Sequence, residues 1–179
     1  MNNTTLPKFS AYIATSLDGY IAGKNDELDW LSNFAMLGED YGYQAFADNI
    51  DAMLIGRNTY QTLLGFPNWP YSNKRVIVLS SQRLKITIPN VELFNGNFDM
   101  LLTFLAKENL HHVYVDGGIT ISQFLNRGLL NQLIISIMPI VLGEGKHLFK
   151  ELKNQINLEL INSKTFTNGV VQLSYTAKY

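Results

Sequence analysis

The chain has 179 residues, with 14 lysines and arginines against 15 aspartates and glutamates, and it contains no cysteine. This length suits one domain with a full core, so we expect a single domain over residues 1–179. The near-neutral charge offers no basic surface for nucleic acid. The lack of cysteine excludes disulfides, thiolate catalysis and the cysteine-based zinc sites, including that of nucleobase deaminases.

Two further classes are disfavoured. The three histidines lack the spacing of metal ligands, so we expect no metal site. No apolar run is long enough to cross a membrane, and residues 1–7 lack the charged-then-apolar pattern of a signal peptide. We therefore expect a cytoplasmic protein that does not bind membranes.

Predicted strands and helices alternate along most of the chain. The helix at 97–109 has the clearest pattern, with Asn97 as cap, Asp99 in the first turn and Lys107 in the last. The predicted strands are 8–15, 51–56, 74–80, 90–94, 112–116, 132–142, 156–166 and 170–178, and the predicted helices are 27–36, 40–49, 57–65, 97–109 and 119–127.

This order predicts an α/β fold. Strands separated by helices indicate right-handed crossovers on a parallel sheet. The last two strands meet at Asn168-Gly169, which can supply the positive φ angles of a tight primed hairpin turn. Pro139 marks a bulge or an edge within 132–142. We expect three α/β/α layers around a mixed, mainly parallel sheet of about eight strands, with an antiparallel C-terminal hairpin whose apolar edge favours a homodimer.

Two strands run directly into helices through glycine. The strand at 51–56 ends at Gly56 before Arg57, and the strand at 112–116 is followed by Gly117 and Gly118, with Thr120 as the expected N-cap of the next helix. Such junctions expose backbone N–H groups at the positive end of a helix dipole, which attracts phosphate. The pair suggests a site for a doubly phosphorylated nucleotide, although glycine is also the ordinary residue of tight turns.

The strand at 74–80 ends in Ser80 and Ser81, and Arg83 follows. NAD enzymes of the Rossmann type place a carboxylate there, whereas short donors with an arginine suit the 2′-phosphate of NADPH. Two serines after a strand can equally cap a turn. Near the N-terminus, glycines flank a short apolar segment over residues 16–23, which describes either a loop that closes over a ligand or a simple turn at Asp18-Gly19.

Four motifs in their order together resemble the dihydrofolate-reductase-like superfamily, and most closely the reductase domain at the C-terminus of the bifunctional riboflavin-biosynthesis deaminase-reductase. They are TSLDGYIA (15–22), DAMLIGRNTY (51–60), VDGG (115–118) and PIVLGEG (139–145) with Leu148-Phe149. The resemblance implies an NADPH-dependent reductase and a homodimer. Its implied cofactor residues are Gly56, Arg57 and Thr59 for phosphate, Ser80, Ser81 and Arg83 at the adenosine end, Gly117, Gly118 and Thr120 at the pyrophosphate, and Ala14, Ile21 and Ala22 at the nicotinamide.

One departure concerns the substrate. Dihydrofolate reductase itself holds the pterin ring with an acid on its first helix, and the matching position here, anchored on Trp30, falls near Ala35. Asp29 and Asp18 are the nearby acids, and they are our candidate catalytic proton donors. The sequence thus predicts a reductase of a small heterocycle, similar to 5-amino-6-(5-phosphoribosylamino)uracil reductase or to a divergent dihydrofolate reductase. The alternative is a catalytically inactive nucleotide-binding module that acts as a sensor or assembly partner.

Overall fold

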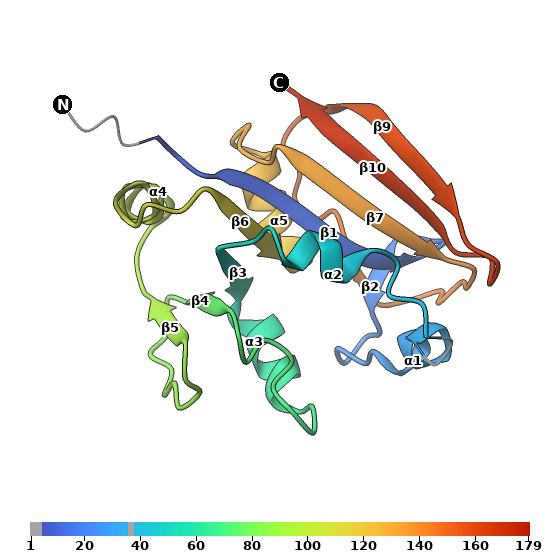
Figure 1. The fold of residues 1–179 in the computed structure, drawn as a ribbon, viewed down its shortest axis with the longest axis horizontal. Coiled ribbons are helices and arrows are strands. Elements are labelled where there is room, and N and C mark those ends of the chain that lie inside the picture. The colour runs from blue at the N-terminus through green and yellow to red at the C-terminus, as the bar shows by residue number, and fades with distance from the viewer. Residues whose placement is uncertain (1–4, 36–37) are drawn as a thin grey trace.

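A computed structural model describes residues 5–35 and 38–179, and it contains one eight-stranded sheet flanked by helices (Figure 1). The strands of this sheet are β1 (Lys8–Ser16), β3 (Ala52–Gly56), β4 (Arg75–Leu79), β5 (Val91–Phe94), β6 (His112–Asp116), β7 (Gln132–Met138), β9 (Asn157–Thr165) and β10 (Val171–Lys178). The helices are α1 (Asp29–Ala35), α2 (Tyr43–Ala47), α3 (Arg57–Leu64), α4 (Phe98–Lys107) and α5 (Gly118–Leu125). None of the described helices is long and apolar enough to cross a membrane.

The strand order is β5-β4-β3-β6-β1-β7-β10-β9, which Figure 1 shows from left to right. Neighbours from β5 to β7 are parallel, whereas β10 is antiparallel to both β7 and β9. The predicted mixed, mainly parallel sheet with an antiparallel C-terminal hairpin is therefore confirmed. Because β3, β6 and β1 lie in the middle, they are covered on both faces and consist mainly of apolar residues.

Different helices cover the two faces of the sheet. Alternate residues of β6 illustrate the division, since Val113 and Val115 belong to the core that contains residues of α4 and α5. Tyr114 belongs instead to a second core with residues of α2 and α3. This alternation is the two-residue period of a strand. The three-layer prediction is confirmed by these two cores.

Several local predictions hold and others are wrong. Asn97 caps α4 as expected, because its side chain accepts a hydrogen bond from the Met100 amide at 2.9 Å. The cap of α5 is Gly117 and not Thr120, which lies inside the helix and is buried. Gly117 can adopt the required φ of 92°, so the helix starts three residues earlier than an N-cap at Thr120 would place it.

Several element boundaries also differ from expectation. The seventh strand ends at Met138 rather than at residue 142, because Pro139 cannot donate to the ladder. The helix expected at 40–49 is reduced to α2, and α1 begins at Asp29; residue 36, the expected end of α1, lies outside the described residues. At the hairpin, the Phe166 amide donates to Val170 O at 2.9 Å, so residues 167–169 form a three-residue loop rather than a primed two-residue turn. Gly169 has a positive φ there, whereas Asn168 does not.

A small second sheet was not predicted. It pairs β2 (Tyr20–Ala22) with β8 (Lys146–His147), two segments far apart in the sequence. The Leu148 amide donates to Gly19 O at 3.0 Å, and the rings of Tyr20 and His147 stack with centroids 4.2 Å apart. A Cβ on Gly118, two residues after the end of β6, would lie 2.8 Å from His147 O, so this sheet lies beside the carboxyl end of β6.

Candidate functional site

The two glycine junctions meet at one edge of the sheet. β3 and β6 are parallel neighbours, and Ile55 pairs with Asp116, so Gly56 and Gly117 follow side by side at the carboxyl ends of their strands. Ligands of open α/β sheets bind outside these carboxyl ends. Both junctions therefore open at the same edge of the sheet, as a shared nucleotide site requires.

Each glycine faces a threonine of the other junction. A Cβ on Gly56 would lie 3.3 Å from Oγ1 of Thr120, and a Cβ on Gly117 would lie 2.7 Å from Oγ1 of Thr59. Both threonines are the third residue of their helix, in α5 and α3 respectively. Side chains at the glycines would thus fill the space between two helix N-termini, where backbone N–H groups lack partners within the helix. Helix N-termini attract anions such as phosphate, and we call the space between these two the glycine cradle.

A cleft of about 1050 Å³ runs along this edge. All of the predicted cofactor residues except Arg83 line it: Ala14, Ile21, Ala22, Gly56, Arg57, Thr59, Ser80, Ser81, Gly117, Gly118 and Thr120. Arg83 is exposed and does not line the cleft. The Gln82 amide donates to Ser80 Oγ at 3.0 Å, so Ser80 also caps its own turn, as the simpler interpretation of this segment expected.

The two predicted catalytic acids lie outside the cleft lining. Asp18 accepts hydrogen bonds from the amides of Leu142 (3.1 Å) and Gly143 (2.8 Å), and thereby fastens the loop before β2 to the segment after β7. Its hydrogen bond with the Ser16 side chain, together with these amides, lowers the Asp18 pKa to about 2. Asp29 is the exposed first residue of α1. Their catalytic roles stay predictions.

Asp116 is a cleft residue that sequence reasoning did not select. It ends β6, and its Oδ1 accepts a hydrogen bond from the Gly117 amide at 2.8 Å. Loss of solvent raises the Asp116 pKa to about 6, although the Gly117 amide and the Tyr114 hydroxyl lower it in part. The available signal was an acid between a buried strand and a Gly-Gly junction, a place where perturbed carboxyls are often functional.

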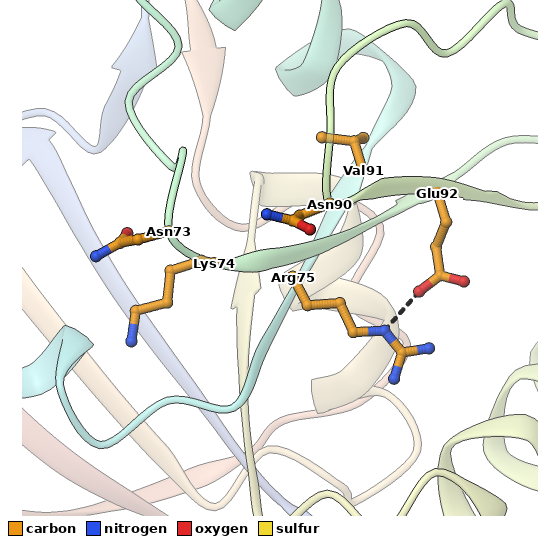
Figure 2. A pocket seen from close by; sticks show the side chains of 6 residues that line it. All are labelled: Asn73, Lys74, Arg75, Asn90, Val91 and Glu92. Atoms are coloured by element: carbon orange, nitrogen blue, oxygen red, sulfur yellow. Dashed lines mark hydrogen bonds and ion pairs between the residues drawn. The ribbon is translucent and has the colours of Figure 1, made fainter.

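A second, smaller hollow of about 600 Å³ lies at the opposite ends of β4 and β5. Figure 2 shows its lining side chains, among which Arg75 reaches Glu92, with Nε and Oε1 2.6 Å apart. Arg75 also bonds to Glu108, and Lys74 donates to the backbone oxygens of Ala47 and Ile50. The cations of this hollow are therefore engaged within the chain, and they join secondary-structure elements to one another.

The fold and the cleft define the class of protein. A sheet of this order, with two glycine junctions at one edge, is the dihydrofolate-reductase-like fold, and dihydrofolate reductase from Enterococcus faecalis, complexed with NADP(H), matches it with a TM-score of 0.66. That comparison covers 96% of this chain and 97% of the other at 19% identity, so it shows the fold alone.

The particular family is shown by sequence. The model of the RibD C-terminal domain matches residues 7–172, and the chain belongs to this family. It is 33% identical to the Bacillus subtilis (strain 168) protein YyaP over 186 residues, which cover 97% of each chain. It is also similar to the crystal structure of a putative riboflavin biosynthesis protein from Shewanella sp. PV-4, with a TM-score of 0.86 and 34% identity over 96% of this chain and 99% of that one.

Proposed function

We propose that the protein is an NADPH-dependent reductase of a small heterocyclic substrate, similar to 5-amino-6-(5-phosphoribosylamino)uracil reductase or to a divergent dihydrofolate reductase. The carrying observation is the glycine cradle, in which Gly56 and Gly117 keep side chains out of the space between two helix N-termini. Family membership supports a reductase, and the Enterococcus faecalis structure with NADP(H) supports a nicotinamide cofactor on this fold.

The cleft residues suggest where such a cofactor would be held. The cradle residues of α3 and α5, with the Arg57 guanidinium, would receive the phosphates. At the adenosine end, the cofactor would contact Ser80 and Ser81 of the cleft lining, and also Arg83, which lies outside that lining. The nicotinamide would lie against Ala14, Ile21 and Ala22. When bound, the cofactor supplies a hydride to the substrate.

The proton for the reduction needs a donor within reach of the substrate. Asp116 lines the cleft, and a carboxyl with a pKa of about 6 exists in both protonation states near neutral pH. We therefore add it to the candidates Asp29 and Asp18. Replacing each of these aspartates by asparagine should identify the donor, since only the donor's variant loses turnover and changes the pH profile while NADPH affinity holds.

The function is tested by following NADPH oxidation at 340 nm with a panel of pyrimidines and pteridines. We expect oxidation that depends on one of these heterocycles. Tight NADPH binding without turnover on any of them would favour the alternative of an inactive nucleotide-binding module, whose basis is the missing acid near Ala35.

We also propose a homodimer formed through β9. This strand is an edge of the large sheet, and all nine of its residues are exposed. Leu160 is 52% and Ile161 60% exposed, which leaves apolar side chains beside unpaired backbone groups. Such an edge is a template for pairing with another chain, and a second copy presents the same edge.

A further inference from the structure

A row of side chains crosses three neighbouring strands and ends at the cleft. Gln172 of β10 pairs with Ser136 of β7, which in turn pairs with Ala14 of β1, and Figure 1 shows these strands side by side. Directly paired residues point to the same face of a sheet, and so does Tyr12, which lies two residues before Ala14. Ala14 and Tyr12 line the cleft, whereas Gln172 is not among the described residues that line it. The row thus leads from the C-terminal hairpin to the cleft wall.

The side-chain amide of Gln172 connects oxygen atoms from three separate segments. Its Nε2 lies 2.8 Å from Tyr12 Oη, 3.0 Å from Tyr41 O and 3.0 Å from Ser136 Oγ. A carbonyl oxygen can only accept, so Tyr41 O requires the amide nitrogen, and not the amide oxygen, on this side. The Tyr12 hydroxyl donates to the same Tyr41 O at 2.7 Å. Gln172 and Tyr12 are therefore joined both directly and through Tyr41.

Tyr41 takes part through its backbone and its side chain. Its φ is 56°, a left-handed conformation that a residue other than glycine keeps only where its surroundings hold it. Its hydroxyl donates to Phe34 O of α1 at 3.1 Å and accepts a hydrogen bond from Asn168 Nδ2 of the hairpin loop at 2.6 Å. Because Leu31 of α1 lines the cleft, these bonds fasten a second part of the cleft wall to the C-terminal hairpin.

Tyr12 lies where a substrate of the proposed reaction would have to bind. The proposed function assigns Ala14 to the nicotinamide, and hydride transfer requires the accepting ring to lie in contact with the nicotinamide. Tyr12 is one side-chain repeat, about 6.6 Å, from Ala14 on the same face of β1. A buried polar network that is fully bonded holds its side chains in one arrangement, and a reacting pair loses rate when its geometry shifts by about 1 Å.

We propose that Gln172 is a positioning residue for the substrate of the reduction, because its amide holds the Tyr12 ring and, through Tyr41, helix α1 in place at the cleft. This inference rests on the proposed reductase function and deepens it. Tyr12 contacts the substrate, and Gln172 acts only through Tyr12 and Tyr41. Removal of the donor at Gln172 and removal of the acceptor at Tyr12 therefore break the same hydrogen bond.

Gln172→Met tests the proposal, because methionine has a similar length and cannot donate a hydrogen bond. The assay uses the pyrimidine or pteridine that the wild type reduces fastest. We expect kcat/KM for this compound to fall about threefold to tenfold, as for loss of one hydrogen bond, while the Kd of NADPH stays unchanged. Tyr12→Phe should cause a similar loss, and the double variant should lose no more than the more affected single variant.

Thr176→Val is the matched control. Thr176 lies on the same face of β10, four residues after Gln172, but it pairs with Gln132 at the start of β7 and is not among the described cleft residues. The substitution removes a polar group from the same strand with little change in shape. It should leave kcat/KM and NADPH binding as in the wild type.

Fluorine NMR reports on the same hydrogen bond without any substrate. The nine tyrosines are replaced by 3-fluorotyrosine, and the resonance missing from Tyr12→Phe belongs to Tyr12. Burial raises the pKa of Tyr12, and the hydrogen bonds from Gln172 and Ser136 oppose that rise. Gln172→Met should therefore raise the pKa of the fluorinated Tyr12 phenol further, whereas Thr176→Val should not change it.

The outcomes separate this inference from the proposed function. An unchanged Tyr12 pKa in Gln172→Met, a wild-type kcat/KM in that variant, or losses that multiply in the double variant would overturn this inference alone. If Gln172→Met does not fold, a wild-type kcat/KM in Tyr12→Phe would overturn it. A wild type that reduces no heterocycle would overturn the proposed function, and the fluorine resonance would still decide whether Gln172 holds Tyr12.

Discussion

The substitution Gly56→Ala should weaken NADPH binding at the cradle while leaving the stability of the fold nearly unchanged. Gly56 has φ −76° and ψ 163°, which alanine adopts without strain, and the new methyl would lie 3.3 Å from Thr120 Oγ1. Gly→Ala at a compatible position stabilises a protein by about 0.4–1 kcal/mol, and tight packing opposes this gain. At about 2–4 °C per kcal/mol for a chain of this size, Tm should change by less than about 4 °C.

Cofactor binding should respond much more strongly. The methyl occupies the space between the two helix N-termini, so a phosphate there would lose at least one charge-assisted hydrogen bond, worth about 1.5–3 kcal/mol. Calorimetry should therefore show NADPH affinity reduced about tenfold to a hundredfold. Gly65→Ala is the control, because a Cβ there would meet Thr62 O at a similar 3.2 Å but Gly65 does not line the cleft. If Gly56→Ala binds NADPH as tightly as the control does, the cradle is not a phosphate site.

Three other predictions address charge and assembly. Arg57→Ala should remove most of the preference for NADPH over NADH, and equal affinity of the wild type for both cofactors would contradict the assignment. The Asp116 pKa of about 6 lies above the ordinary aspartate value of 3.8, so the folded chain binds an extra proton between these pH values and its stability falls as pH rises through them. Asp116→Asn should then raise the free energy of unfolding by up to about 3 kcal/mol at pH 8 and change it little at pH 3.5. An equal change at the two pH values would contradict the raised pKa of Asp116. Sedimentation should find a dimer at micromolar concentration and a monomer for Ile161→Lys, and a monomeric wild type would refute the β9 interface.

The sheet and the glycine junctions could be predicted because their signals are local. β-branched runs mark the central strands, and a glycine between strand and helix fixes where each junction opens. The pairing of β2 with β8 could not be predicted, since strands of three and two residues have no measurable periodicity and their contact spans more than a hundred positions. The N-cap at Gly117 was missed because threonine is the commoner capping residue, whereas the positive φ of Gly117 is set by its tertiary neighbours.

Asp116 could not be singled out from the sequence either. Its raised pKa depends on burial at the end of β6, and the surrounding tyrosines come from separate segments of the chain. Sequence alone places Asp116 beside Gly117 but gives no measure of its desolvation. Asp18 and Asp29 were candidates because they are the acids near Trp30, where the helix acid of dihydrofolate reductase is missing, yet the Asp18 carboxylate bonds to the amides of Leu142 and Gly143.

Transfer of deuterium is the most direct test of the proposed reductase. NADPH carrying deuterium at C4 of the nicotinamide, on either face in separate experiments, is incubated with the protein and the heterocycle that best stimulates NADPH oxidation, and the product is analysed by mass spectrometry. We predict one deuterium in the reduced heterocycle from one of the two labelled cofactors. NADPH oxidation without label in the product from either cofactor, or the absence of any reduced product, would contradict hydride transfer in this cleft.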